Sequence, residues 1–342
     1  MKRFLITVIL GFGCPLLLLL GIYLWTDPFR CLHTFDINDI DATNREYLST
    51  ELFLRYYPTQ QYNAFIFSSS RGCGFNTYTW KTYIGEDTRP FLFQAWGETL
   101  TGIELKMDYL DKHDVNIEHA IIMFDIPGTF GSTQLSHEAL GMKHWIFTKS
   151  SRFSYNAIQY YNFIQKPSFW IKNIHKTLEH SKETCCSDTI SNDWESDNCL
   201  NYATLPPQDS LKKCSDMTRR TFFAKLNSVQ DSAQKVSQPI IKGEFVEQLK
   251  HIKAILDTQN TDYHILLSPA ICYLHPSVNP LDLEILENIF GKERVHDYTG
   301  RNELTEDYNN FSDPNHFGLR VGYLIMQDIY GTRKLSSSIS GE

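Results

Sequence analysis

The sequence has no clustered run of basic residues. Its 342 residues include 32 lysines and arginines against 40 aspartates and glutamates, which gives a formal net charge of -8 and a pI near 5.8. A protein that binds nucleic acid through its phosphates needs a concentrated basic face. The composition therefore argues against a general nucleic-acid-binding protein, and we predict no nucleic-acid partner. The chain also lacks an internal repeat.

No two cysteines are spaced as Cys-x-x-Cys, although the chain contains eight cysteines. Structural zinc sites are commonly built on such pairs, and no acidic metal-binding motif stands out. We therefore predict no metal and no cofactor, and a metal-dependent glycosyltransferase is disfavoured. Cys185, Cys186, Cys199 and Cys214 crowd one polar segment. Their spacing could close small disulfide loops in an exported protein, and unpaired loop cysteines fit as well.

Long apolar runs are absent except at the N-terminus, where Lys2 and Arg3 precede an almost uninterrupted apolar stretch over residues 4–25. Roughly 20 apolar residues suffice to span a bilayer, whereas the apolar part of a signal peptide is shorter and precedes a small-residue cleavage site. No such site follows Leu20. We predict that residues 1–27 are an uncleaved single-pass anchor, with a cleaved signal as the alternative. The basic residues should stay in the cytoplasm, which makes the body of the protein extracytoplasmic or periplasmic.

The rest of the chain alternates between two kinds of apolar pattern. Short runs typical of buried strands occur at residues 62–68, 90–96, 117–126, 262–268 and 294–298. Helical spacing occurs at residues 44–56, 100–110, 245–256, 281–290 and 319–330. A strand, helix, strand rhythm predicts parallel pairing with right-handed crossovers, so we predict an α/β fold with a five-stranded parallel sheet. Residues 71–87, rich in Gly, Thr and aromatics, are predicted to be irregular.

The regular rhythm stops between about residues 129 and 238. This segment contains many aromatic residues, among them Trp145, Phe153 and Tyr161. We interpret it as a long, mostly helical insertion that adds no central strand to the sheet. Its aromatic side chains are most simply core, although exposed ones could stack on sugars. Residues 28–342 are thus predicted to form a single α/β domain with an insertion.

Two polar motifs could form a nucleophilic site. Ser68, Ser69 and Ser70 follow the first predicted strand, and Asp313 and His316 stand three residues apart just before the last helix. Ligands of open α/β sheets bind outside the carboxyl ends of the strands. A serine hydroxyl becomes nucleophilic when a histidine takes its proton, and a carboxylate orients and stabilises that histidine. The motifs together predict a Ser-His-Asp triad.

Each motif also has a simpler interpretation. Consecutive serines are common in turns and caps. Asp313 or Asn315 could cap the closing helix and leave His316 exposed. Arg71, which follows the predicted nucleophile, could bind an anionic substrate group, since guanidinium suits carboxylate or phosphate. It could equally be a buried ion-pair partner.

The order of these motifs resembles that of the SGNH/GDSL hydrolase family. Residues 68–70 occupy the place of the family's Gly-Asp-Ser, Gly97 matches the glycine block after the second strand, and Asp313 and His316 match the Asp-x-x-His block. The resemblance covers roughly residues 60–128 and 245–331. By layout the chain is similar to the membrane-anchored envelope branch, which includes alginate O-acetylation and teichoic-acid D-alanylation proteins.

The resemblance implies a flavodoxin-like three-layer α/β/α fold. It also implies that Ser70 is the nucleophile, His316 the general base and Asp313 its partner, with the backbone N–H groups of Ser70 and Gly97 in the oxyanion hole. One family block is missing, because Asp125 stands where an asparagine donor is expected. An ionised carboxylate cannot donate a hydrogen bond, and loss of one oxyanion donor typically lowers turnover by roughly 10² to 10³.

Two functions remain open at this point. The first is an extracytoplasmic serine esterase or O-acyltransferase that acts on an acylated envelope glycan or a small ester. The missing donor would then be replaced, for example by Asn76 or Asn156. The second is a catalytically inactive protein with the same fold that binds glycans or assists envelope assembly.

Overall fold

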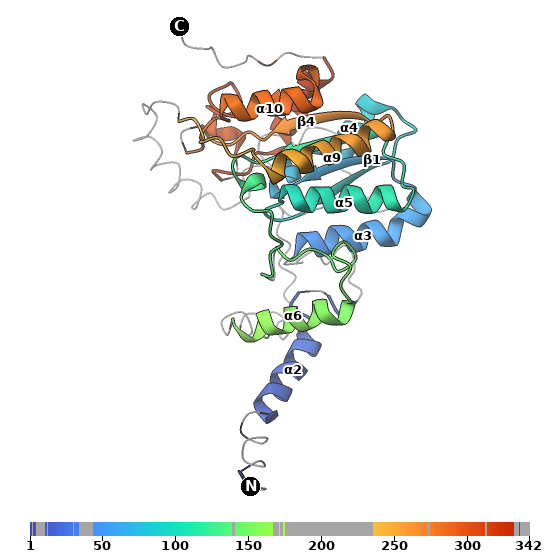
Figure 1. Ribbon diagram of the computed structural model, residues 1–342, viewed down its shortest axis with the longest axis vertical. Helices are drawn as coiled ribbons and strands as arrows, with labels where there is room; N and C mark the ends of the chain where they lie inside the picture. Colours follow the sequence, from blue (N-terminus) through green and yellow to red (C-terminus); the bar gives the residue numbers. More distant parts are fainter. Residues whose placement is uncertain are drawn as a thin grey trace. The chain divides into compact units, whose positions relative to one another are not determined.

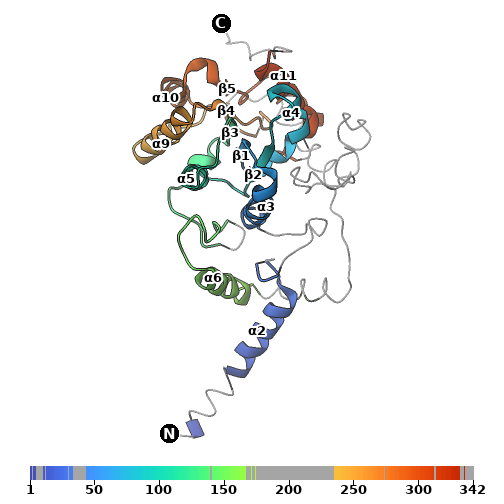
Figure 2. The same cartoon turned by 90° about the vertical axis from the view of Figure 1, so that its right-hand side faces the viewer.

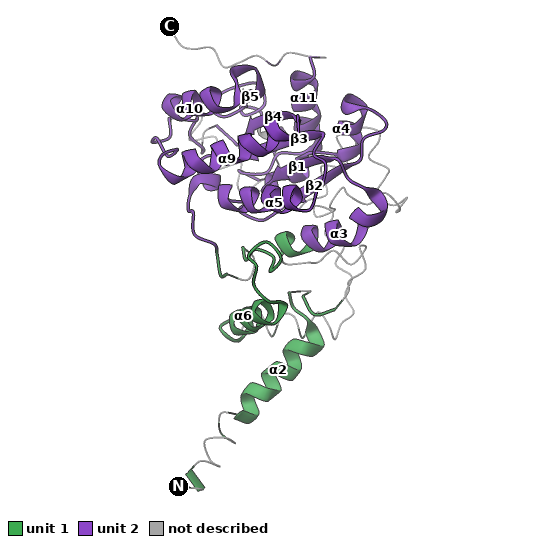
Figure 3. Cartoon of the chain, turned by 45° about the vertical axis from the view of Figure 1, so that its right-hand side comes forward, with its two compact units in different colours: residues 1–48, 136–185 green, residues 49–135, 186–342 purple. Residues whose placement is uncertain are grey.

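The structure is a computed structural model. It describes residues 13–29, 31–33, 44–138, 141–166, 235–272, 274–311 and 313–331, together with residues 1, 3, 4, 11, 171, 174 and 335. The chain divides into two compact units (Figure 3). Unit 1 comprises residues 1–48 and 136–185, and unit 2 comprises residues 49–135 and 186–342. The single domain expected from residue 28 onward stays a prediction.

Unit 2 contains a five-stranded sheet whose strands are all parallel. The strands are β1 (Ala64–Ser68), β2 (Pro90–Gln94), β3 (His119–Phe124), β4 (Asp262–Leu267) and β5 (Val295–Asp297). Their order in the sheet is β2-β1-β3-β4-β5. This is the flavodoxin-like order, and each strand lies within its predicted range. The prediction of an α/β fold with a parallel sheet is therefore confirmed.

Helices cover both faces of this sheet (Figures 1 and 2). They are α3 (Arg45–Gln60), α4 (Thr77–Ile84), α5 (Leu100–Lys112), α9 (Glu244–Thr258), α10 (Pro280–Phe290) and α11 (Leu319–Ile329). Short 3-10 turns follow two of the strands, η2 (Ser70–Gly74) after β1 and η3 (Gly128–Phe130) after β3. Helices α4 and α11 lie on one face, whereas α5, α9 and α10 lie on the other (Figure 2). The result is a three-layer α/β/α arrangement.

Strand β1 shows why this sheet could be recognised in the sequence. Ile66 faces a core that includes Trp80 of α4 and Val321 of α11. Phe65 faces the opposite side, where Phe53 of α3 lies 6.1 Å from it between ring centroids. All five residues of the strand are buried. A parallel strand that is covered on both faces has a nearly continuous apolar sequence, in place of an alternating one.

The prediction that residues 71–87 are irregular was wrong, because they contain η2 and α4. Asn76 caps α4 by accepting a hydrogen bond from the Thr79 N–H at 2.9 Å. Trp80 is fully buried, and its indole N–H donates to the Tyr330 hydroxyl at 2.6 Å. Threonine and aromatic residues have only moderate helix propensity, and this tertiary burial outweighs it.

Unit 1 contains helices α2 (Cys14–Thr26) and α6 (Arg152–Ile164). The two helices pack on each other through a small core made of Tyr23, Phe29, Cys31, Tyr47, Met142, Tyr155 and Phe163. Helix α6 belongs to the predicted insertion, and the described part of that insertion supplies no strand to the sheet. The four crowded cysteines of the insertion lie outside the described residues.

The predicted anchor is described only in part, since residues 2, 5–10 and 12 lie outside the described residues. The part that is described ends in α2. Among the helices that the structure describes, none combines the length and the apolar character needed to cross a membrane.

Candidate active site

The predicted site residues meet at the carboxyl end of the sheet. The chain passes from β1 to β2 on one side and then returns to β3 on the other side of β1. Such a reversal of strand order is the place where open α/β sheets bind ligands. Ser70 follows β1 and Asp125 follows β3, so both residues lie at this reversal.

The three consecutive serines have three different surroundings. Ser68 is buried against Gly72, where a Cβ atom would lie only 1.8 Å from the Ser68 Oγ. Ser69 caps η2 by accepting from the Arg71 N–H at 3.1 Å, and its hydroxyl donates to Asp125 at 2.5 Å. Ser70 alone of the three is partly exposed. Its side chain is therefore the one that a substrate could reach.

Ser70, His316 and Asp313 form a continuous hydrogen-bonded chain. His316 Nε2 lies 2.8 Å from Ser70 Oγ, and His316 Nδ1 lies 2.7 Å from an Asp313 carboxylate oxygen. The other Asp313 oxygen accepts from the backbone N–H groups of Asn315 and His316, at 2.8 and 3.0 Å. Residues that are far apart in the sequence thus have the contacts that a triad requires.

The hydrogen bonds to Asp313 decide its charge. Burial alone would raise the pKa of this carboxyl, but the hydrogen bond from His316 and the two backbone N–H groups outweigh burial and lower the pKa. Asp313 is therefore ionised near neutral pH. A carboxylate in this place favours the His316 tautomer with a proton on Nδ1 and stabilises the imidazolium.

The loop that carries His316 is held at both of its ends. Phe311 and Phe317 form an antiparallel bridge, and the Gly318 N–H donates to the Asn310 carbonyl at 2.9 Å. The Phe317 ring meets Phe75 edge-on, with centroids 5.7 Å apart. Gly318 is the N-cap of α11, so the interpretation of Asp313 or Asn315 as the helix cap was wrong.

A close backbone contact joins the nucleophile turn to α11. A Cβ atom at Gly322 of α11 would lie 1.9 Å from the Gly74 carbonyl oxygen. A Cβ atom at Gly74 would lie 2.1 Å from the Phe317 ring. Only glycine fits at these two positions. A glycine inside a helix was the available signal for this contact, because it costs about 1 kcal/mol relative to alanine and usually has a packing reason.

Arg71, the residue after Ser70, contacts two side chains of the site, those of Asp125 and Asn315. Its guanidinium lies 3.7 Å from Asp125 and donates to the Asn315 side chain at 3.5 Å. The Arg71 side chain is only 8% exposed. The alternative of a buried ion-pair partner is therefore confirmed, whereas binding of an anionic substrate group stays a prediction. The ion pair compensates the charge of the Asp125 carboxylate.

The oxyanion-hole donors are less defined than the triad. Gly97 lies in an exposed turn after β2 with a φ of 58°, a left-handed conformation that favours glycine. The side chain of Asn76 is engaged in capping α4. Asn156, the other proposed substitute, belongs to α6 of unit 1. The placement of Gly97 and Ser70 N–H groups around an oxyanion stays a prediction.

Sequence reasoning missed two polar residues near the triad. Gln94 is fully buried at the end of β2, and its amide donates to the Ser70 carbonyl at 3.3 Å and to the Cys73 sulfur at 2.9 Å. It therefore holds the nucleophile turn in place. A glutamine inside a buried apolar strand was the available signal, since such residues are mostly exposed.

His275 is the second residue that was missed. Its turn is fixed beside the His316 loop because the Ile271 N–H donates to the Pro314 carbonyl at 3.2 Å. Burial and the nearby Arg71 charge lower the pKa of His275, against the opposing effect of Asp125 and Asp313. A neutral imidazole thus stands near the triad at neutral pH. Nothing in the local sequence indicated this placement.

Among the described residues, no group of three or more His, Cys, Asp or Glu side chains could hold a metal ion. No protein-family model matches the chain, and no curated protein matches it. The resemblance to the SGNH/GDSL hydrolases therefore stays a prediction from motifs and their order.

Proposed function

We propose that the protein is a serine esterase or O-acyltransferase that uses Ser70, His316 and Asp313 on an acylated envelope glycan or a small ester. Residues 1–27 would hold it at the membrane, with its body outside the cytoplasm. The observation that carries the proposal is the hydrogen-bonded chain from Ser70 Oγ through His316 to Asp313. The partly exposed Ser70 hydroxyl at the reversal of strand order adds support.

The first half of the reaction forms an acyl-enzyme. Ser70 Oγ attacks the ester carbonyl while His316 Nε2 takes the hydroxyl proton. The negative charge that develops on the carbonyl oxygen is stabilised by backbone N–H groups, for which Ser70 and Gly97 are the candidates. When the intermediate collapses, the ester C–O bond breaks, and the imidazolium of His316 gives its proton to the leaving alcohol.

The second half removes the acyl group from Ser70. A hydroxyl of water or of a sugar attacks the acyl carbon while His316 Nε2 takes its proton. Collapse of this second intermediate returns that proton to Ser70 Oγ. Water gives hydrolysis and a sugar hydroxyl gives transfer, with the same protein groups in both. The alternative, a non-catalytic glycan-binding or assembly protein, is favoured by a single observation, which is that Asp125 replaces the expected asparagine donor.

A serine-directed fluorophosphonate probe tests the proposal. The full-length protein should be labelled at Ser70, and both Ser70→Ala and His316→Ala should abolish the labelling. His251→Ala is the matched control, because His251 is a half-exposed histidine of α9 that pairs with Glu104 and Asp108. A folded wild-type protein that neither labels nor hydrolyses generic acyl esters would instead support the non-catalytic alternative.

A further inference from the structure

Helix α2 exposes an unusual amount of apolar surface. Leu16, Leu17, Leu18, Leu24 and Trp25 are each 48–68% exposed, whereas only Tyr23 and Thr26 of this helix are buried. Burying one large apolar side chain contributes about 1.5–3 kcal/mol, so such a surface is not stable against water. A partner of apolar character must cover it.

Helix α6 presents a second apolar stripe. Phe153, Ala157 and Tyr161 follow one another at intervals of four residues, and all three are exposed. Four residues is close to one helical turn, so these side chains share one face. The opposite side of the helix is buried through Tyr155, Gln159 and Phe163. The exposed aromatic side chains of α6 therefore do not belong to the core of unit 1.

The two helices are in direct contact. The Tyr160 hydroxyl of α6 donates to the Leu16 carbonyl of α2 at 2.7 Å, and the Tyr23 ring lies 5.3 Å from that of Tyr160. Leu16 and Tyr23 are seven residues apart, which is about 10 Å along a helix. Tyr160 of α6 therefore contacts α2 at two positions that are about two helical turns apart.

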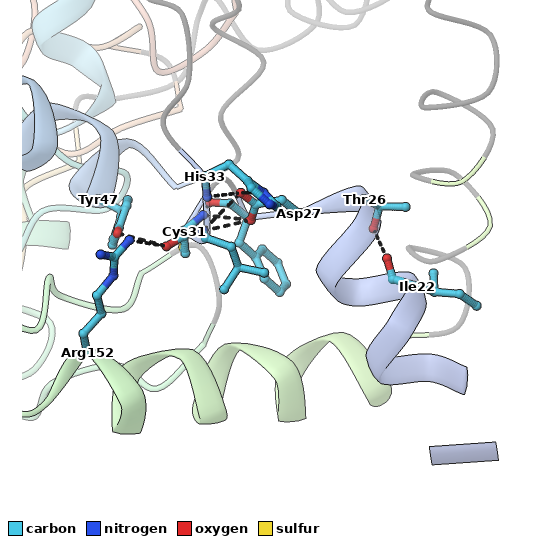
Figure 4. A network of polar contacts seen from close by, with 9 residues as sticks. Ile22, Thr26, Asp27, Cys31, His33, Tyr47 and Arg152 are labelled. Carbon is cyan, nitrogen blue, oxygen red and sulfur yellow. Dashed lines mark hydrogen bonds and ion pairs between the residues drawn. The ribbon is translucent and has the colours of Figure 1, made fainter. Parts of the chain in front are cut away.

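A polar junction fixes the geometry of the two helices (Figure 4). The Asp27 carboxylate, at the end of α2, accepts hydrogen bonds from the backbone N–H groups of residues 31–33. The Cys31 carbonyl in turn accepts from the Tyr47 hydroxyl at 3.2 Å and from Arg152, the first residue of α6, at 3.4 Å. The end of α2 and the start of α6 are thus joined through one acceptor group.

The charge of this region differs from that of the whole chain. Residues 141–166 contain Lys143, Lys149, Arg152 and Lys166 but no Asp or Glu, in a chain whose net charge is -8. Lys143 pairs with the buried Glu46, whereas the other three are exposed. Exposed basic residues around an aromatic-rich helix are typical of helices that lie in the headgroup region of a membrane.

We infer that α6 lies in the headgroup region of the extracytoplasmic leaflet and that it forms, together with α2, one two-helix membrane contact. Phe153 and Tyr161 face the acyl chains, and Lys149, Arg152 and Lys166 meet lipid phosphates. This inference rests on the membrane anchor of the proposed function. Because α6 packs on the apolar helix α2 and carries exposed basic side chains near both of its ends, a bilayer fits its exposed aromatic face better than a sugar or a second copy of the chain.

Site-specific photocrosslinking tests the inference. The full-length protein would carry p-benzoylphenylalanine at one of three exposed apolar positions, which are Leu17 of α2, Phe153 of α6 and Leu281 of α10. It would be reconstituted in vesicles of phosphatidylcholine and phosphatidylglycerol and irradiated, and adducts would be identified by mass. We expect lipid adducts at positions 17 and 153 and at least a tenfold lower yield at position 281, the matched control.

The outcomes separate this inference from the anchor itself. Lipid adducts at position 17 without adducts at position 153 would overturn the placement of α6 and leave the anchor standing. No lipid adduct at either position would refute the anchor. A protein dimer joined through position 153 would show that a second copy covers α6. None of these outcomes depends on catalysis, which the fluorophosphonate probe measures separately.

Discussion

Each of the two ends of the parallel sheet has a histidine that is hydrogen-bonded to another side chain, but the partners differ. At the carboxyl end, His316 lies between a serine hydroxyl and a carboxylate that is held by backbone N–H groups. Toward the amino ends of β4 and β5, His264 lies 3.0 Å from His296 between ring nitrogens. Only the first arrangement gives a proton a directed path from a partly exposed nucleophile to a base.

The His264 and His296 pair is better explained as structure. Burial, followed by repulsion from His296, lowers the pKa of His264 to about 4. His264 is therefore neutral at pH 7, and a hydrogen bond can join the two imidazoles. Two close polar groups thus make a candidate catalytic site only when a substrate can reach one of them and the other has a partner for the charge it gains.

The largest expected effect is a loss of ester turnover on substitution of residues at the carboxyl end of the sheet, and not at the amino end. Ser70→Ala and His316→Ala should each lower ester turnover by roughly a thousandfold or more, and the double variant should be little worse than either. Asp313→Asn should have a similar or milder effect. His296→Ala is the matched variant at the other end and should leave turnover within about threefold of wild type, a margin that spans the roughly 0.6 kcal/mol of one RT unit. If the losses of the two single variants multiplied in the double variant, Ser70 and His316 would not act as one catalytic unit.

The second prediction concerns Arg71 and Asp125. Arg71→Ala leaves the Asp125 carboxylate without its countercharge beside Ser70, so we expect kcat to fall by roughly tenfold to a hundredfold. Adding Asp125→Asn removes that charge and introduces a possible donor, and it should restore most of the loss. Steady-state kinetics of Arg71→Ala, of Asp125→Asn and of the double variant provide a double-mutant cycle for the ion pair. Additive losses would show that the ion pair does not act on the reaction.

The third prediction tests the glycine contact beneath the triad. Gly322→Ala places a Cβ atom against the Gly74 carbonyl and should lower the stability by about 1–3 kcal/mol, as overpacking typically does. Esterase activity should fall as well, since the contact sets the distance between the Ser70 turn and the His316 loop. Gly21→Ala is the matched control, because a Cβ atom there meets nothing within 4 Å. Thermal unfolding of both variants measures the difference, and equal Tm values would contradict the contact.

The sequence predicted the sheet well because its strands are buried on both faces and are therefore continuous apolar runs, as β1 illustrates. It also predicted which serine and which histidine would meet, because parallel strands end at one edge of the sheet. It did not predict α4, whose stability comes from burial of Trp80. Nor did it predict the contacts of Gln94 or His275, which arise from tertiary packing between segments far apart in the chain.

The smallest expected effect comes from the amino end of the sheet. The pKa of His264 is lowered from 6.5 to about 4 in the folded protein, so the unfolded chain binds a proton more readily. Its contribution to stability is therefore fully present above pH 6.5 and is lost as the pH falls through the folded value near 4. The titratable and charged groups that face His264 are His296, Asp262, Arg294 and His119.

His264→Phe tests this assignment, since phenylalanine can keep the edge-on contact with Tyr330, whose ring centroid lies 5.4 Å from that of His264. The quantity to measure is the difference in unfolding free energy between wild type and variant, at several pH values from 7 to 4. As the pH falls, wild type should lose stability relative to the variant, because the unfolded wild-type chain binds a proton at His264 and the variant has no proton to bind there. His275 also has a lowered pKa, but it is present in both proteins and cancels in the difference. A difference that stays constant with pH would show that His264 is not held neutral by the fold.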